Sequence, residues 1–182
     1  FTKSSPLIQL VMGPRQVGKT TGVKQFIAEM EKNSNKCFFA SADDQLVASN
    51  DWLKLQWQNA ALLGPNTILA IDEIQKVENW FETIKGLWDA QIDKNNSIKV
   101  LLLGSSSLAL SRGATESLAG RFELIPVYHW NYIESQQLHK EISLETYLKF
   151  GGYPKSYEFL EDYDRYINYT KISIIDLSLI HI

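Results

Sequence analysis

The chain has 182 residues, of which 45% are hydrophobic and 21% charged, and its formal net charge is −3. This composition is typical of a folded globular protein and excludes fibrous and fully disordered classes. With 18 basic against 21 acidic residues, the balance disfavours nonspecific binding to a polyanion but leaves a local basic patch open. The apolar runs are shorter than the ~20 residues that cross a bilayer. The single cysteine, Cys37, fits a reducing cytoplasm, where we expect the protein to reside.

Strands and helices alternate along the first two thirds of the chain. Short apolar runs predict strands at residues 7–12, 37–40, 67–71, 98–103 and 122–127. Apolar positions at helical spacing predict helices at residues 19–32, around residues 52–57 and at residues 80–88. Pro126 shortens the fifth strand or places it at an edge. Such alternation favours a parallel sheet covered by helices, with ligands at the carboxyl ends of the strands.

The pattern changes after residue 128. Residues 134–139, 144–150 and 155–169 have helical patterns, interrupted by Gly151-Gly152-Tyr153-Pro154. We therefore expect an α/β core at residues 1–128 and a small helical lid at residues 129–169. Residues 170–182 are expected to begin a C-terminal segment that is cut off before its packing partner.

A complete phosphate-binding motif follows the first predicted strand. Residues 13–20 read Gly-Pro-Arg-Gln-Val-Gly-Lys-Thr and match G-x-x-x-x-G-K-[ST]. Its glycines let the main chain curve close to phosphate oxygens, and successive N–H groups at a helix N-terminus supply positive potential. Lys19 would reach the β- and γ-phosphates, and the Thr20 hydroxyl would bind Mg²⁺. The expected nucleotide-binding residues here are Gly13, Pro14, Arg15, Gln16, Val17, Gly18, Lys19 and Thr20; a chance match is the alternative, and Arg15 could equally point to solvent.

Two acids follow the third predicted strand. The apolar run at residues 68–71 leads directly into Asp72 and Glu73. Asp72 is placed to hold Mg²⁺ through a water, and Glu73 to polarise the water that attacks the γ-phosphate. The alternative is that both acids cap the next helix, because acidic residues are favoured in a first turn. The functional interpretation is favoured, since the pair follows a complete phosphate-binding motif on a separate strand.

Polar and cationic groups adjoin the last two predicted strands. The fourth strand leads into serines, of which Ser105 and then Ser106 are candidates to orient the attacking water. The alternative for each serine is a helix N-cap. Arg121 precedes the fifth strand and could reach the γ-phosphate of a neighbouring subunit as an arginine finger. A surface salt bridge is an equally weighted alternative for Arg121.

Gly151-Gly152-Tyr153-Pro154 lies at a junction between predicted helices. Glycine permits backbone angles that other residues avoid, and proline suits the first turn of a helix. In a lid beside a nucleotide, this segment would pack on the adenine and ribose, with Pro154 in contact and Lys155 near the phosphates. A turn without a ligand is the alternative.

Five segments together resemble a known family: residues 13–20, Ile-Asp-Glu-Ile-Gln (71–75), Gly-Ser-Ser (104–106), Leu-Ala-Gly-Arg (118–121) and Gly-Gly-Tyr-Pro (151–154). They are similar to the predicted ATPases of the AAA+ superfamily that carry a GPRQ-type loop. The resemblance implies a P-loop α/β/α fold with a five-stranded parallel sheet of order 5-1-4-3-2, a helical lid, and ATP with Mg²⁺. Members of this group usually continue into a C-terminal domain, which we expect to be missing here. Where members often carry Thr before the Gly-Ser of the fourth strand, this sequence has Leu103.

These features predict a Mg²⁺-dependent ATPase whose turnover changes the conformation of an attached or bound protein. The expected catalytic residues are Glu73, Lys19, Arg121 and Ser105, and the expected metal ligands are Thr20 and Asp72. The main alternative is a slow nucleotide-gated switch that holds ATP or ADP. A small-molecule kinase is another, although it does not need the acid pair. The expected partners are ATP and either a further copy of this chain or another protein. We expect no membrane partner, and the net charge does not support binding to nucleic acid, which stays open for the full-length chain.

Overall fold

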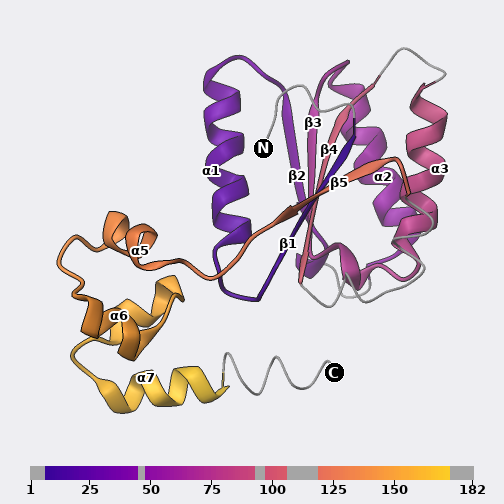
Figure 1. Ribbon diagram of the computed structural model, residues 1–182. Helices are drawn as coiled ribbons and strands as arrows, with labels where there is room; N and C mark the ends of the chain where they lie inside the picture. The colour runs from indigo at the N-terminus through magenta and orange to yellow at the C-terminus, as the bar shows by residue number, and fades with distance from the viewer. Residues whose placement is uncertain (1–6, 45–47, 93–96, 106–118, 173–182) are drawn as a thin grey trace. The chain divides into compact units, whose positions relative to one another are not determined.

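The computed structural model describes residues 7–44, 48–92, 97–105 and 119–172 (Figure 1). These residues fall into two compact units. The first unit takes the described residues of Phe1–Met12 and Lys19–Pro126, and the second takes those of Gly13–Gly18 and Val127–Ile182. The segment that carries the glycines of the phosphate-binding motif, residues 13–18, is called the phosphate loop below, and it belongs to the second unit.

The first unit is built on a five-stranded sheet. Its strands are β1 (Ile8–Gly13), β2 (Cys37–Ser41), β3 (Ile68–Asp72), β4 (Lys99–Ser105) and β5 (Phe122–Pro126). They lie in the order β2-β3-β4-β1-β5. The predicted order 5-1-4-3-2 is the same order counted from the opposite edge, so the predicted fold class is confirmed. β1 pairs with β5, and β3 pairs with both β2 and β4, in parallel.

Helices cover both faces of this sheet. α1 (Lys19–Lys32) lies on one face, and α2 (Asn50–Leu62) and α3 (Trp80–Ile92) lie on the other (Figure 1). α1 begins and ends at the predicted residues and buries Val23, Ile27 and Met30. Two short 3-10 turns, η1 (Ala42–Asp44) and η2 (Ile74–Lys76), follow β2 and β3.

The core of the first unit follows the two-residue period of its strands. Leu69 and Ile71 of β3, and Val100 and Leu102 of β4, share one buried cluster with the apolar side chains of α2 and α3. The residues between them are also buried, because α1 covers the opposite face. Strands buried on both faces read as continuous apolar runs, which is why they could be located from the sequence.

The second unit consists of short helical elements. They are α5 (Tyr132–Leu138), α6 (Leu144–Phe150), the 3-10 helix η4 (Pro154–Phe159) and α7 (Tyr163–Tyr169). α5 begins at a capping box in which Asn131 and Glu134 bond each other's backbone N–H groups. Ser143 caps α6 by accepting a hydrogen bond from the N–H of Thr146. Ile142, Phe150 and Tyr157 form a small buried cluster within the described part of this unit.

The prediction of one helix over residues 155–169 is wrong. η4 ends at Phe159, and α7 begins anew after Asp162, whose side chain accepts a hydrogen bond from the N–H of Arg165. The tighter 3-10 winding of η4 belongs to the segment that buries Tyr157 in the small cluster. Packing of one aromatic side chain and a local cap therefore override the helical pattern.

Among the described residues, every helix is too short or too polar to cross a bilayer.

Candidate functional site

The backbone of the phosphate loop adopts an unusual conformation. Gln16 has a φ of 63° and Gly18 a φ of 95°, both in the region that L residues seldom occupy. Val17, between them, is buried with 1% of its surface exposed. A Cβ placed on Gly18 would meet no atom within 4 Å, so the space beside this glycine is open. Such a curved loop can turn successive N–H groups towards an anion.

Gly13 has a role that the motif alone does not explain. A Cβ at this position would lie 2.0 Å from the carbonyl oxygen of Val127, within the second unit. Only glycine permits the two main chains to approach so closely. The first glycine of the motif is therefore required by packing against residue 127, in addition to any contact with phosphate.

Two aromatic side chains of the second unit hold the phosphate loop. The indole Nε1 of Trp130 donates a hydrogen bond of 3.1 Å to the carbonyl oxygen of Val17. The hydroxyl of Tyr169 donates to Oε1 of Gln16. Sequence reasoning missed both residues, because no spacing relates them to the loop. Only composition could have drawn attention to Trp130, because it is the one tryptophan of the sequence after Trp88.

In the first unit, the hydroxyl and the acid expected to bind metal lie together. Thr20 Oγ1 donates a hydrogen bond of 2.7 Å to Asp72 Oδ2. The other oxygen, Asp72 Oδ1, accepts from the backbone N–H of Glu73 at 3.0 Å. Thr20 lies in the first turn of α1 next to Lys19, and Asp72 is the last residue of β3, with 5% of its surface exposed. Elements far apart in the sequence thus bring a hydroxyl oxygen and a carboxylate together.

This arrangement fits Mg²⁺. Hydroxyl and carboxylate oxygens are the ligands that Mg²⁺ prefers, and it commonly takes few of them from the protein. Thr20 and Asp72 would hold Mg²⁺, which would supply positive charge beside bound phosphate. No group of three or more His, Cys, Asp or Glu side chains suited to a metal occurs within the described ranges. Mg²⁺ in proteins usually keeps several water ligands and binds substrate phosphates as well as one or two side chains.

Glu73 is held in a strained conformation beside this pair. Its φ of 52° and ψ of 41° are left-handed, and its side chain makes no capping hydrogen bond to η2. Residues other than glycine adopt such angles at a cost of ~1–3 kcal/mol, often at functional sites. Gln75 Nε2 donates a hydrogen bond to Glu73 Oε2. Gln75 was not singled out from the sequence, although it lies two residues after Glu73.

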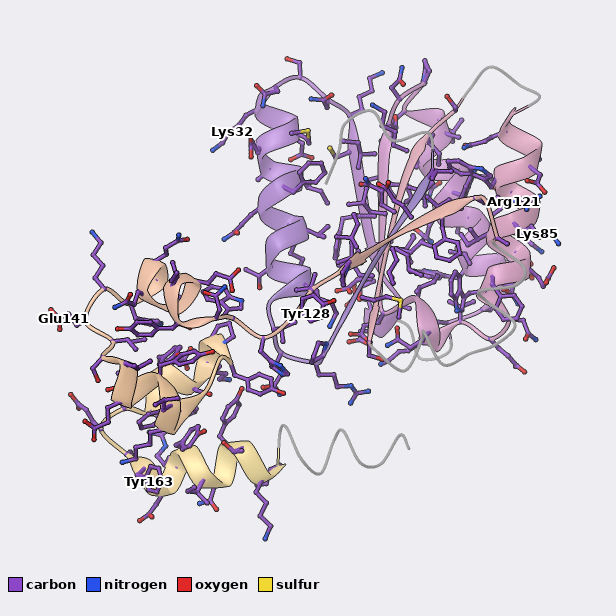
Figure 2. The ribbon with its side chains drawn as sticks, viewed as in Figure 1. Lys32, Lys85, Arg121, Tyr128, Glu141 and Tyr163 are labelled. Carbon is purple, nitrogen blue, oxygen red and sulfur yellow. The ribbon has the colours of Figure 1, made fainter. Side chains whose placement is uncertain are left out.

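Ser105 and Arg121 differ in their surroundings. Ser105 is the last residue of β4 and is buried, and Ser106 lies outside the described residues. Arg121 donates to both carboxylate oxygens of Asp89 in α3, at 2.7 and 3.0 Å, so the salt bridge that the sequence left open is present. This hydrogen-bonded pair raises the pKa of Arg121 and lowers the pKa of Asp89. Figure 2 shows Arg121 on the α3 side of the first unit, near Lys85.

Gly151-Gly152-Tyr153-Pro154 connects α6 to η4 within the second unit. Gly151 ends α6 with a φ of 72°, and Pro154 begins η4. A Cβ on Gly152 would lie 2.1 Å from the carbonyl oxygen of Trp130. The ring of Tyr153 packs edge-on against His129, with centroids 4.5 Å apart. The segment is thus a turn with specific backbone contacts, and Pro154 at its end is the first residue of η4.

The fold and the motif together define a class of protein. A parallel sheet of this order, with the phosphate-binding motif between β1 and α1 and an acid at the end of β3, is the architecture of a P-loop nucleoside-triphosphatase domain. A family model described as an AAA domain matches residues 5–136, and the chain belongs to that family.

Individual proteins agree with this assignment. The uncharacterised protein Rv2008c of Mycobacterium tuberculosis is 34% identical over 118 residues, which are 65% of this chain and 24% of the relative. The chain thus matches about a quarter of that relative's length. AMPPCP-bound DnaA from Aquifex aeolicus has a similar structure, with a TM-score of 0.59 and 16% identity over 96% of this chain and 64% of DnaA. A RuvB mutant of Thermotoga maritima matches with a TM-score of 0.52 and 17% identity, covering 74% and 42% of the two chains.

Proposed function

We propose that this chain binds ATP with Mg²⁺ and hydrolyses it to ADP and phosphate, and that turnover changes the conformation of an attached or bound protein. The observation that carries the proposal is the 2.7 Å contact between Thr20 Oγ1 and Asp72 Oδ2. P-loop enzymes give Mg²⁺ two protein ligands, which are a hydroxyl at the start of the helix after the phosphate loop and a carboxylate at the end of another strand of the sheet. The DnaA structure with its nucleotide analogue supports the choice of ligand class.

Each residue has a proposed role. The phosphate loop and Lys19 hold the phosphates, and Thr20 and Asp72 hold Mg²⁺, which neutralises phosphate charge when bound. Glu73 accepts a proton from the attacking water, and its fixed backbone limits the directions that its carboxylate can take. Ser105 orients that water from the end of β4. These roles use positioning and charge neutralisation, which supply most of the catalysis in phosphoryl transfer.

Two further residues complete the proposal. Pro154, the first residue of η4, packs on the adenine and ribose. Arg121 acts across subunits in an oligomer. For that role its guanidinium must exchange Asp89 for a γ-phosphate, because the carboxylate occupies it in the single chain.

Three variants test these roles against matched controls. Lys19→Ala should abolish ATP binding or weaken it severely, whereas Lys32→Ala at the far end of α1 should bind normally. Glu73→Gln should bind ATP and lose hydrolysis, whereas Glu78→Gln should retain both. Binding is measured by calorimetry and hydrolysis by steady-state phosphate release.

Mixing Arg121→Ala with Glu73→Gln protein should restore part of the activity if oligomers form. No recovery in confirmed mixed oligomers contradicts the trans role. Unchanged ATP binding by Lys19→Ala contradicts the proposed function.

A slow nucleotide-gated switch is the second candidate, and a specific observation supports it. The carboxylate of Glu73 is bonded to Gln75, and the guanidinium of Arg121 is bonded to Asp89. Both groups that turnover needs are therefore occupied within the chain itself. A switch of this kind would retain ADP through purification and release phosphate at a negligible steady rate. Rapid turnover by the wild type excludes it.

A further inference from the structure

The bond from Trp130 to the phosphate loop determines which way one peptide group faces. The indole N–H reaches the carbonyl oxygen of Val17 at 3.1 Å, and the Val17–Gly18 peptide is trans. In a planar trans peptide the C=O of one residue and the N–H of the next point in opposite directions. Holding the Val17 oxygen towards Trp130 therefore directs the Gly18 N–H away from it. A Cβ built on Gly18 would meet no atom within 4 Å, so other residues do not crowd the loop on that side of Gly18.

The main chain of Trp130 is itself held on both sides. Its N–H donates to the carbonyl of Gly152 at 2.9 Å, and its carbonyl accepts from the hydroxyl of Tyr147 at 3.0 Å. A Cβ on Gly152 would lie 2.1 Å from the Trp130 oxygen and 3.1 Å from its carbonyl carbon and nitrogen. Only glycine at residue 152 permits this approach. The Gly-Gly-Tyr-Pro segment and α6 thus set the position of Trp130.

Tyr169 makes a second connection to the same loop. Its hydroxyl, at the end of α7, donates to the side chain of Gln16, whose φ is positive. Burial, with smaller contributions from Tyr153 and Glu158, raises the pKa of Tyr169 to about 12. The hydroxyl therefore remains a donor at neutral pH. Two aromatic side chains, from the start and the end of the helical segment, hold consecutive residues of the loop.

We propose that Trp130 is a positioning residue that orients the Val17–Gly18 peptide for phosphate, and that Gly152 fixes Trp130 in place for this purpose. The inference rests on the proposed function, because it presumes that the loop binds phosphate. It assigns to the Gly-Gly-Tyr-Pro segment an effect on the nucleotide through Trp130, separate from any contact of Pro154 with the base. Nucleotide binding and the arrangement of the short helices are thereby linked through one hydrogen bond.

Indole NMR of the full chain tests this directly. The sequence has 5 tryptophans, of which Trp52, Trp57, Trp80 and Trp88 belong to helices α2 and α3, so Trp130→Phe identifies the remaining indole N–H signal. Adding ADP with Mg²⁺ should shift the Trp130 signal more than the signal of half-buried Trp52. In the nucleotide-free protein, Gly152→Ala should also move the Trp130 signal. Gly86→Ala in α3 is the matched control and should not, because a Cβ there meets nothing within 4 Å.

Affinity supplies the second readout. Trp130→Phe keeps a ring but removes the N–H donor, and the loss of one hydrogen bond is expected to weaken ATP binding about five- to tenfold. Hydrolysis at saturating ATP should be retained, since the residue acts on the loop and not on the attacking water. Trp52→Phe should bind ATP as the wild type does.

The outcomes separate this inference from the proposed function. A wild type that binds no nucleotide, or binds it without Lys19, overturns the proposed function and the inference with it. Binding that needs Lys19, together with an unmoved Trp130 signal and unchanged affinity in Trp130→Phe, overturns the inference alone. Where Gly152→Ala fails to fold, the response of the wild-type Trp130 signal to ADP decides. Where Trp130→Phe fails to fold, Trp→Phe variants of the four tryptophans in α2 and α3 assign the Trp130 signal by elimination, and its response to ADP decides.

Discussion

The two units of this chain are stabilised in different ways. The first buries long apolar strands between helices, and its described core is almost entirely aliphatic side chains and tryptophan. The second has a core of Ile142, Phe150 and Tyr157 and leaves large apolar side chains such as Leu148 exposed. All 8 tyrosines of the sequence lie between Tyr128 and Tyr169. Figure 2 shows one of them, Tyr163, at the edge of the second unit.

Tyrosine hydroxyls compensate for the small core. Four of them donate to backbone carbonyls within the second unit: Tyr132 to Ile142 at 3.3 Å, Tyr147 to Trp130 at 3.0 Å, Tyr157 to Gly151 at 2.6 Å and Tyr166 to Phe150 at 3.1 Å. Helices of seven residues are too short to be stable alone in water. A buried ring with a satisfied hydroxyl contributes both apolar area and a fixed direction. Broad apolar packing therefore defines the first unit, whereas individual hydrogen bonds define the second.

The largest expected effect is in the core of the first unit. Leu102 lies on β4, the central strand of the sheet, and is fully buried. Leu102→Ala should lower the free energy of unfolding by ~2–5 kcal/mol, because it leaves a cavity between layers that cannot collapse. Leu62→Ala, at an 84% exposed position, is the control and should have almost no effect. Urea unfolding followed by tryptophan fluorescence measures both, and equal midpoints would contradict the description of this core.

A smaller and more local effect is expected from Phe150→Ala in the second unit. Phe150 is buried and packs against Tyr163 and Tyr166, which can move into part of the vacated space. We expect a loss of roughly 2 kcal/mol from the second unit, below the ~3–5 kcal/mol usual for Phe→Ala, because these rings fill part of the cavity. Tyrosine fluorescence should report earlier unfolding while the tryptophan transition of the first unit stays in place. If both transitions move together, the two units unfold as one, which contradicts their being stabilised separately.

The smallest effect is expected from alkaline pH. Burial raises the pKa of Tyr169 to about 12, above its usual value of about 10. The folded protein therefore holds this proton more tightly than the unfolded chain does, so its stabilising effect is complete below pH ~10 and disappears as pH rises towards 12. Burial also raises the pKa of Tyr153 and of Tyr157. Tyrosinate absorbance should show the second unit opening in this window before the main part of the tryptophan fluorescence changes, because four of the five tryptophans lie in α2 and α3 of the first unit.

Tyr169→Phe provides the control for the alkaline transition. It removes the titrating group together with its bond to Gln16. The variant should be less stable near neutral pH and should lose less of its remaining stability between pH ~10 and 12 than the wild type does. An identical alkaline profile would show that Tyr169 does not contribute to the transition.

The features of this protein that depend on local order and on continuous burial could be predicted from the amino-acid sequence. Five strands and the helix after the phosphate loop could be predicted, because strands buried on both faces and a complete phosphate-binding motif leave strong periodic and compositional signals. The sheet order was implied by the resemblance to a known family. The roles of Lys19, Thr20, Asp72 and Glu73 follow from the same signals and stay predictions. The prediction of one helix over residues 155–169 was wrong, because the cap at Asp162 and the burial of Tyr157 overrode the helical pattern.

Which distant groups meet depends on the fold and could not be predicted from the sequence. Arg121 is hydrogen-bonded to Asp89, which lies 32 residues away in the sequence, and Trp130 to Val17, which lies 113 residues away. No spacing pattern in the sequence indicates either pair. Gly152 reads in the sequence as a turn residue, yet its necessity comes from the main chain of Trp130 lying against it. The physical reason is that hydrogen bonds and close approaches depend on where folded segments come together, whereas periodicity reports only which face of a segment is buried.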